Sequence, residues 1–143
     1  DRNWDTHGKM SRYTKLARNV DRPIAALLKD LKRRGMLDET LVVWTTEFGR
    51  SPFAPFAGAL GRGHHAPAYS SWLAGGGVRG GTVYGKSDPW GDQVTENPVS
   101  VHDLHATILH QLGLDHKRLT YRHAGRDYRL TDVHGRVVRE LLS

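Results

Sequence analysis

The sequence has no cysteine, no long apolar run and no concentration of charge of one sign, and each absence excludes a class of protein. Without cysteine the chain forms no disulfide and uses no thiolate as nucleophile or metal ligand. Its apolar runs fall well short of the roughly 20 residues that a transmembrane helix needs. A hydrophobic share of 38% over 143 residues, with 16 glycines, instead suits one modest, loop-rich α/β domain with its own core.

Positive charge is in excess but scattered. Lysine and arginine number 21 against 15 acidic residues, which gives a formal charge of +6. The tight basic groups are residues 32–34 and Lys117-Arg118, and the first is typical of the polar end of a helix, where cations interact favourably with the helix dipole. The scatter argues against a nucleic-acid partner, whereas the surplus suits a small anionic substrate. We therefore expect neither nucleic acid nor membrane among the partners.

The first residues, Asp1-Arg2-Asn3-Trp4-Asp5, offer no initiator methionine, signal peptide or helix cap. We therefore expect residues 1–143 to be a piece of a longer protein, one α/β domain that is incomplete without upstream residues. The N-terminal half of the same precursor is then a candidate partner.

Periodic apolar residues predict a first helix over Tyr13–Arg34. Pro23 leaves two alternatives, a kinked single helix or a second helix capped by Asp21. Gly35 is expected to end the helix in a left-handed conformation. The run Leu41–Thr46 then predicts a buried strand.

The remaining pattern predicts further strands and helices. Strands are expected at Ala68–Ala74 and Thr82–Tyr84, with a loop over Trp90–Asn97. Ser100 and Asp103 predict a capping box for a helix over Val101–Leu112, and Gly113 its end. Thr131 is expected to cap a final helix with apolar residues 133, 137, 138, 141 and 142. Alternating helices and buried strands predict an α/β fold with a largely parallel sheet flanked by helices.

Residues 80–87 match the phosphate-loop pattern G-x-x-x-x-G-K-S. That loop needs a strand before it and a helix after it, so that the helix N-terminus faces phosphate. Here glycines precede the motif and Asp88-Pro89 follows it, so we predict no nucleotide site.

Asp5 and His7 are the first candidate metal ligands. In an extended segment, residues two apart point to the same side, so the carboxylate and the imidazole can converge on one ion. Both groups are ligands of zinc and similar metals. A hydrogen-bonded surface pair is the alternative.

His64, His65 and Glu47 are the other candidates. The two histidines stand in a glycine-flanked loop, and Glu47 stands at the end of the predicted strand, where open α/β sheets place their ligands. Two exposed loop histidines and an ordinary ion pair between Glu47 and Arg50 are the alternatives. Taken together, the three segments predict one divalent-metal site, zinc or calcium-like, held by Asp5, His7, Glu47 and His64 at a common rim of the sheet. Arg50, Arg62 and His65 are the expected substrate-binding residues, the arginines as clamps for an anion.

Several motifs in order resemble a bacterial sulfatase-like family of the alkaline phosphatase superfamily, long catalogued as a domain of unknown function. They are Trp4-Asp5-Thr6-His7, Glu47-Phe48-Gly49-Arg50, Gly61-Arg62-Gly63-His64 and the run 97–105. The similarity covers essentially the whole chain. It implies the C-terminal portion of an alkaline-phosphatase-like α/β fold and, as for many such proteins, export to the periplasm.

The resemblance also implies a chemistry, the metal-dependent hydrolysis of sulfate or phosphate esters. By position, Asp5, His7 and His64 resemble the ligands of one metal site, and Glu47 an acidic ligand of a second. Phe48 replaces a histidine of that second site, and Gly63 replaces the aspartate usual before His64. The superfamily's nucleophile lies in an N-terminal half that this chain lacks, so a non-catalytic module that kept the fold is the alternative function.

Overall fold

The structure, a computed structural model, describes residues 4–5 and 7–143. Its helices and strands are short, apart from the first helix. In chain order they are α1 (Arg12–Arg33), the 3-10 turn η1 (Leu37–Glu39), β1 (Val42–Trp44), β2 (Gly49–Arg50), β3 (His64–His65), β4 (Trp72–Ala74), β5 (Lys86–Ser87), β6 (Val94–Glu96), α2 (Val101–Gln111), β7 (Thr120–His123), β8 (Arg126–Arg129) and the 3-10 turn η2 (Arg139–Leu141). None of the described helices is long and apolar enough to cross a membrane.

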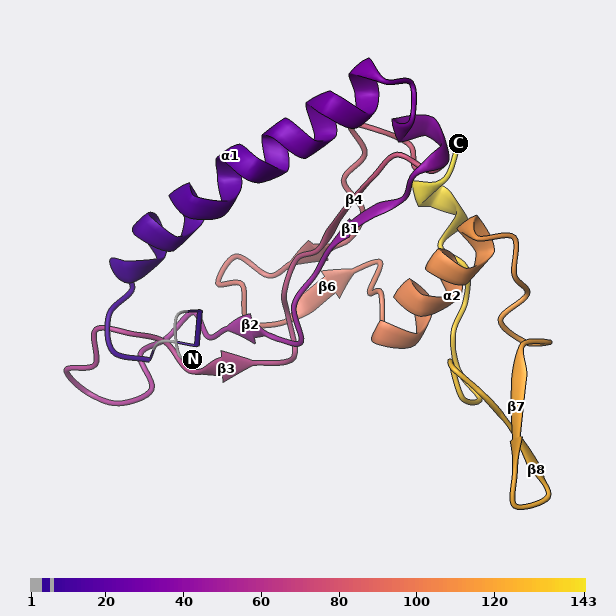
Figure 1. The fold of residues 1–143 in the computed structure, drawn as a ribbon. Coiled ribbons are helices and arrows are strands. Elements are labelled where there is room, and N and C mark those ends of the chain that lie inside the picture. Colours follow the sequence, from indigo (N-terminus) through magenta and orange to yellow (C-terminus); the bar gives the residue numbers. More distant parts are fainter. Residues whose placement is uncertain (1–3, 6) are drawn as a thin grey trace.

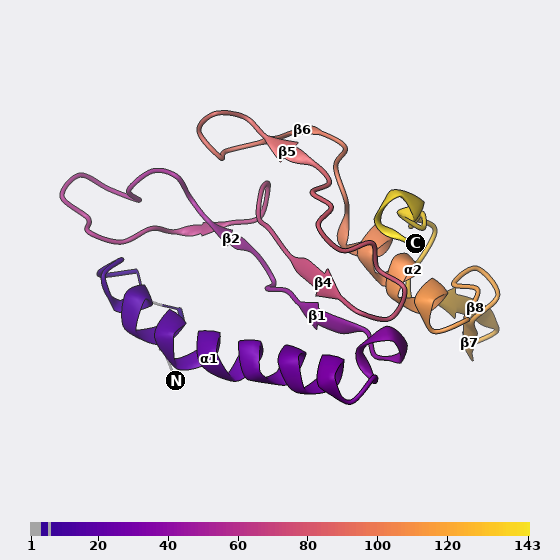
Figure 2. The same cartoon turned by 90° about the horizontal axis from the view of Figure 1, so that it is seen from above.

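Helix α1 is one continuous helix that includes Pro23, so the single-helix alternative is the correct one. Its end is also confirmed: Gly35 has φ +69°, and its N–H donates to the Lys32 carbonyl. The Met36 N–H donates to the Leu31 carbonyl, which completes a Schellman motif. None of the residues described in α1 is buried. The helix therefore lies along the outside of the molecule, with β1 between it and β4 (Figure 2).

The predicted parallel sheet is wrong. Among the described residues the strands form four separate two-stranded sheets, β1–β4, β2–β3, β5–β6 and β7–β8. Every one of these pairs is antiparallel. Figure 1 shows the pairs spread along the molecule rather than joined in one sheet between layers of helices.

The connection between β1 and β4 explains the error. A parallel pair needs a crossover, usually a helix, to bring the chain back to the same end of the sheet. Residues 45–71 contain no helix among those that the structure describes, and include the β2–β3 pair instead. The chain therefore returns antiparallel, with Val42 opposite Ala74 and Trp44 opposite Trp72. The first helix and the strand after it were therefore predicted correctly, but the helical crossover that a parallel pair needs is missing from the described residues 45–71.

The small core is formed by α2 and the C-terminal segment, which lie side by side in both views (Figures 1 and 2). Helix α2 has the predicted capping box, with Ser100 and Asp103 each accepting the other's backbone N–H. Gly113 has φ +75° and follows the helix, as expected. The buried apolar residues are Ala106, Leu109, Val138 and Leu142.

The predicted final helix is wrong, because only η2 is helical after residue 130. Gly135 has φ +91°, which no α-helix contains. The backbone N–H groups that follow bond to side chains of α2: Arg136 donates to Asp103 Oδ1 and Val138 to Thr107 Oγ1. Thr131 is buried against His116 Nδ1 at 2.9 Å, so its hydroxyl does not cap a helix.

Two hairpins also differ from expectation. The predicted strand at 82–84 is wrong, and the predicted loop at 90–97 contains β6, which pairs with β5. Residues 120–129 form the unforeseen hairpin β7–β8, which projects away from α2 in Figure 1. Its two-residue turn has φ +46° at Ala124 and +81° at Gly125, as in a type I′ turn. The described residues 88–100 contain no helix, so residues 80–87 lack the following helix that a phosphate loop needs.

Candidate metal site

The β2–β3 pair provides the base of the site. Its register places Arg50 directly opposite His64, and Gly49 opposite His65. The Ser51 N–H donates to the Gly63 carbonyl at 3.0 Å and extends the pairing by one step. Side chains of directly opposed residues leave a sheet on the same face. Arg50 and His64 are therefore neighbours by backbone register.

The N-terminal segment is docked beside this pair from two sides. Lys9 forms a parallel bridge with Leu60, and the Met10 N–H donates to the Leu60 carbonyl at 3.2 Å. At the other end, the Tyr13 hydroxyl donates to the Trp4 carbonyl at 3.0 Å, and the two rings stack with centroids 6.1 Å apart. The segment that carries the predicted ligands is thus held between α1 and the loop before β3.

Gly61 permits the closest of these contacts. A Cβ placed on Gly61 would overlap the carbonyl oxygen of His7 and approach the nitrogen of Gly8 to 2.9 Å. Both obstacles are backbone, so no side-chain rotation relieves the overlap. Any larger residue must push the His7 segment away from the loop that leads into β3.

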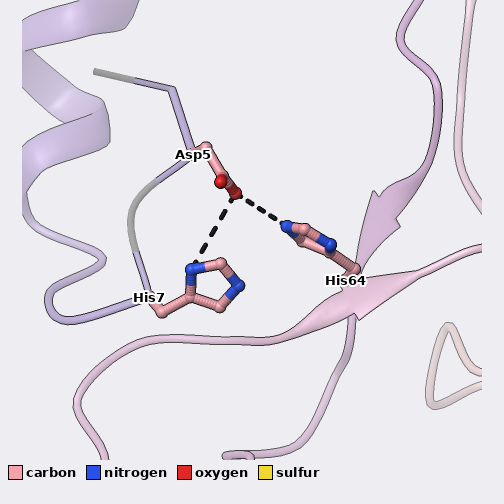
Figure 3. A group of neighbouring side chains, drawn as sticks. All are labelled: Asp5, His7 and His64. Atoms are coloured by element: carbon pink, nitrogen blue, oxygen red, sulfur yellow. Dashed lines mark hydrogen bonds and ion pairs between the residues drawn. The ribbon is translucent and has the colours of Figure 1, made fainter. Parts of the chain in front are cut away.

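Asp5, His7 and His64 converge, as predicted (Figure 3). Each offers one ligand atom, and these atoms all lie within 4.8 Å of one another. His64 Nε2 lies 2.7 Å from Asp5 Oδ1, and His7 Nδ1 lies 3.8 Å from the same oxygen. All three side chains are exposed, so an ion can reach them from solvent. Thr6, the middle residue of the motif, lies outside the described residues.

Arg50 is the fourth member of the cluster. Its Nη2 donates to Asp5 Oδ1 at 2.8 Å and to the Trp4 carbonyl at 3.1 Å. Its Nη1 lies 3.4 Å from His7 Nε2 and donates to the Arg62 carbonyl at 3.3 Å. The side chain is only 20% exposed, against 56% for Asp5. Arg50 therefore holds the N-terminal segment onto β2 by both side-chain and backbone acceptors.

These contacts keep Asp5 ionised in acid. They lower the pKa of its carboxyl from 3.8 to about 2, with the hydrogen bond to His64 contributing most and the bond from Arg50 next. An ionised carboxylate only accepts, so His64 Nε2 is the donor in that bond. Because the pKa is lowered, the stabilisation is present above the ordinary value of 3.8 and is lost as the pH falls through about 2.

Phe48 orients the His64 imidazole. The two rings stack with centroids 3.9 Å apart and planes 27° apart. The Arg50 guanidinium lies 6.0 Å from the Phe48 ring centre. The phenyl ring thus occupies one face of the imidazole and leaves Nε2 directed at Asp5. The sequence shows Phe48 as the replacement of a ligand, and its contact with the His64 ring is visible only in the structure.

The other predicted site residues lie elsewhere. The Glu47 carboxylate is exposed, accepts a bond from Thr46 Oγ1 at 3.1 Å and is not part of the converging group, so its role as a ligand stays a prediction. His65 points to the opposite face from His64, where Nε2 lies 2.7 Å from the Asp92 carbonyl oxygen and the side chain is 11% exposed. Arg62 is exposed and gives its carbonyl to Arg50.

The donor set fits a divalent metal of intermediate softness. Two imidazoles and one carboxylate are the ligands of many zinc sites, whereas calcium takes six to eight oxygens. The imidazoles therefore favour zinc or a similar transition metal over calcium. The stacked Phe48 and the docking of the N-terminal segment hold two of the three groups in place before any ion arrives.

Replacing Arg50 with glutamine tests its contact with Asp5. Loss of the cation removes one of the two main causes of the low pKa, so the titration midpoint of Asp5 rises by about 0.5–1 pH unit. An NMR titration of the carboxyl carbon measures this directly. Arg62→Gln is the matched control, because that exposed guanidinium makes no contact with Asp5 among the described residues. Equal midpoints in the two variants would contradict the contact.

Replacing Gly61 with alanine tests the docking of the N-terminal segment. The added Cβ overlaps the His7 backbone, so the segment moves and Asp5 loses His64 and Arg50 together. The Asp5 midpoint then returns close to 3.8 in the same titration. Gly8→Ala is the control, since a Cβ there meets nothing within 4 Å. A midpoint that stays near 2 in Gly61→Ala would show that the segment does not need this close approach.

Comparison with known proteins corrects the resemblance described above. No curated protein and no solved structure matches the chain. A family model described as "Protein of unknown function (DUF1501)" matches residues 1–142. Nothing found supports membership of the sulfatases or of the alkaline phosphatase superfamily, and the four antiparallel pairs lack the sheet expected of it, so that assignment is wrong. The chain belongs to the family described as a protein of unknown function, DUF1501.

Proposed function

We propose that this chain carries the divalent-metal site of a hydrolase that acts on sulfate or phosphate esters. The observation that supports the proposal is the convergence of one carboxylate and two imidazoles from segments almost 60 residues apart in sequence. One carboxylate and two imidazoles are a ligand set that zinc and similar transition metals accept, and their ligand atoms all lie within 4.8 Å of one another. The proposal rests on this site and not on the discarded superfamily.

Asp5, His7 and His64 would hold the ion. Three protein ligands are the usual number in catalytic zinc sites, where a further position is left for water or substrate. When bound, such a metal polarises an ester oxygen and offsets the negative charge that develops in the transition state. Phe48 fixes the plane of the His64 ring, and Arg50 fixes the position of the Asp5 carboxylate.

The charge around the site suits an anionic ester. The Arg50 guanidinium is the cation nearest to the three ligands, and the exposed Arg62 lies two residues before His64. The chain as a whole carries a formal charge of +6, which raises the local concentration of anions. Sulfate and phosphate esters present oxygens that match the fork of an arginine side chain.

A non-catalytic module that binds metal and anion is the second candidate. One observation favours it: among the described residues, no serine, threonine, tyrosine or lysine side chain hydrogen-bonds to Asp5, His7 or His64. A nucleophile or general acid would have to come from elsewhere. The two candidates share the metal site and differ in turnover.

Removal of a ligand should abolish metal binding. After zinc loading and dialysis, we expect about one zinc per chain in the wild type and a loss of affinity well beyond about tenfold in Asp5→Asn and His64→Ala, because each removes one of three ligands. Elemental analysis and calorimetry measure both. Asp38→Asn and His123→Ala, exposed residues outside the site, are the controls and should keep the metal. Unchanged zinc content in Asp5→Asn and His64→Ala would refute the site.

Turnover separates the two candidates. We expect the zinc-loaded full-length protein to release phenol from an aryl sulfate or an aryl phosphate, and Asp5→Asn to lose this activity while Asp38→Asn keeps it. Release is followed by absorbance, with chelator-treated protein as the blank. Zinc binding without release of phenol from either the aryl sulfate or the aryl phosphate would favour the non-catalytic module instead.

A further inference from the structure

One oxygen atom of the site serves two side chains at once. Asp5 Oδ1 accepts from Arg50 Nη2 at 2.8 Å and from His64 Nε2 at 2.7 Å. A metal held by Asp5 would need the same carboxylate. Metal and Arg50 therefore compete for Asp5, and the outcome of that competition changes what Arg50 can bind.

We propose that the Arg50 guanidinium forms a binding site for a tetrahedral oxyanion, such as sulfate or a sulfate or phosphate monoester, which becomes available when a divalent metal is bound by Asp5, His7 and His64. This inference rests on the proposed metal site and adds to it the order in which the two ligands bind. The metal comes first, and the anion follows.

The hydrogen bonds of Arg50 divide into two sets. One set goes to backbone carbonyls, with Nη2 donating to Trp4 and Nη1 to Arg62. The other set goes to the candidate ligands, with Nη2 donating to Asp5 and Nη1 to His7 Nε2. Each terminal nitrogen thus gives one N–H to the backbone and one to the site. Loss of the second set leaves one N–H on each terminal nitrogen available, and two such donors on one guanidinium can bind two oxygens of an oxyanion.

Metal binding would remove one acceptor of the second set, His7 Nε2, and weaken the other, Asp5. If His7 binds through Nε2, the metal occupies the lone pair that faces Arg50. If His7 binds through Nδ1, the remaining proton of the neutral ring resides on Nε2, which then donates and no longer accepts. The Asp5 carboxylate meanwhile shares its charge with the ion, which weakens its bond to Arg50. Either mode of binding makes the same two N–H groups more available to an anion.

The backbone bonds keep Arg50 in place after this exchange. The carbonyls of Trp4 and Arg62 continue to accept, and the Phe48 ring lies beneath the guanidinium. The side chain is already 80% covered, so it has little freedom to swing into solvent. A preorganised guanidinium loses little entropy when an anion binds.

The charges of the site also favour binding of the metal before the anion. Without metal, Arg50 and Asp5 form a neutral pair, and an anion that approached the guanidinium would meet the Asp5 carboxylate 2.8 Å from it. With a divalent ion present, the same region carries a net charge of about +2. The repulsion becomes an attraction, and by linkage the anion must raise the affinity for the metal by the same factor.

Calorimetric titration of zinc into the full chain, at one ionic strength in sodium chloride and in sodium sulfate, tests the proposal. We expect sulfate to tighten zinc binding about tenfold in the wild type, within the usual range of coupling between two sites. Arg50→Gln removes both the competitor for Asp5 and a contact that docks the N-terminal segment, so its zinc affinity in chloride is the reference for the same variant in sulfate. The tightening by sulfate should disappear in this variant.

Two further variants keep the test decisive. Arg118→Gln removes an exposed guanidinium outside the site and should retain the full sulfate effect, whereas Arg50→Lys keeps the charge without the fork and should retain only part of it. Near-ultraviolet circular dichroism establishes that each variant is folded. If Arg50→Gln is folded, binds zinc and keeps the sulfate effect, the inference is wrong while the metal site stands. If the wild type binds no zinc in either salt, both fail.

Discussion

The contact on which the site depends is the pair of short hydrogen bonds to one oxygen of Asp5. It joins three separate segments: the N-terminal segment, β2 through Arg50, and β3 through His64. Because β2 and β3 are already paired, two of these partners are fixed before Asp5 arrives. The Asp5 carboxylate lies at hydrogen-bond distance from a guanidinium and an imidazole. These two hydrogen bonds are the main cause of its low pKa.

The site does not derive its order from the hydrophobic core. The buried apolar residues belong to α2 and the C-terminal segment, whereas the described part of α1 buries nothing and the three candidate ligands are exposed. Local backbone contacts do the positioning instead: the bridge from Lys9 to Leu60 and the close approach at Gly61. Exposed ion pairs contribute little free energy, so this arrangement is weakly stabilised on its own. A bound ion would add the stabilisation that the core does not provide.

Sequence reasoning succeeded where the physics is local. The capping box of α2 and the left-handed glycine after each helix follow from hydrogen bonds within a few residues, and all were identified correctly. It failed where the outcome depends on distant partners. Whether β1 pairs parallel or antiparallel is set by the path of residues 45–71, which no periodicity reveals. The apolar residues at 133–142 have helical spacing, but Gly135 and the acceptors on α2 draw their N–H groups into other bonds.

The convergence of Asp5, His7 and His64 was predicted from an incorrect fold, and the reason is instructive. In one parallel sheet the strand ends would meet at a common rim, and Glu47 would lie there as well. The structure instead joins the three residues through the register of a two-residue antiparallel pair and a docked N-terminal segment, and this route excludes Glu47 from the group. The Asp-x-His spacing indicates which ligand types are present, and the glycines around His64 indicate a backbone that other segments can approach closely. Both indications are valid in either fold. The place of Arg50 opposite His64 depends on register alone, so only the structure could reveal that the same guanidinium contacts both Asp5 and His7.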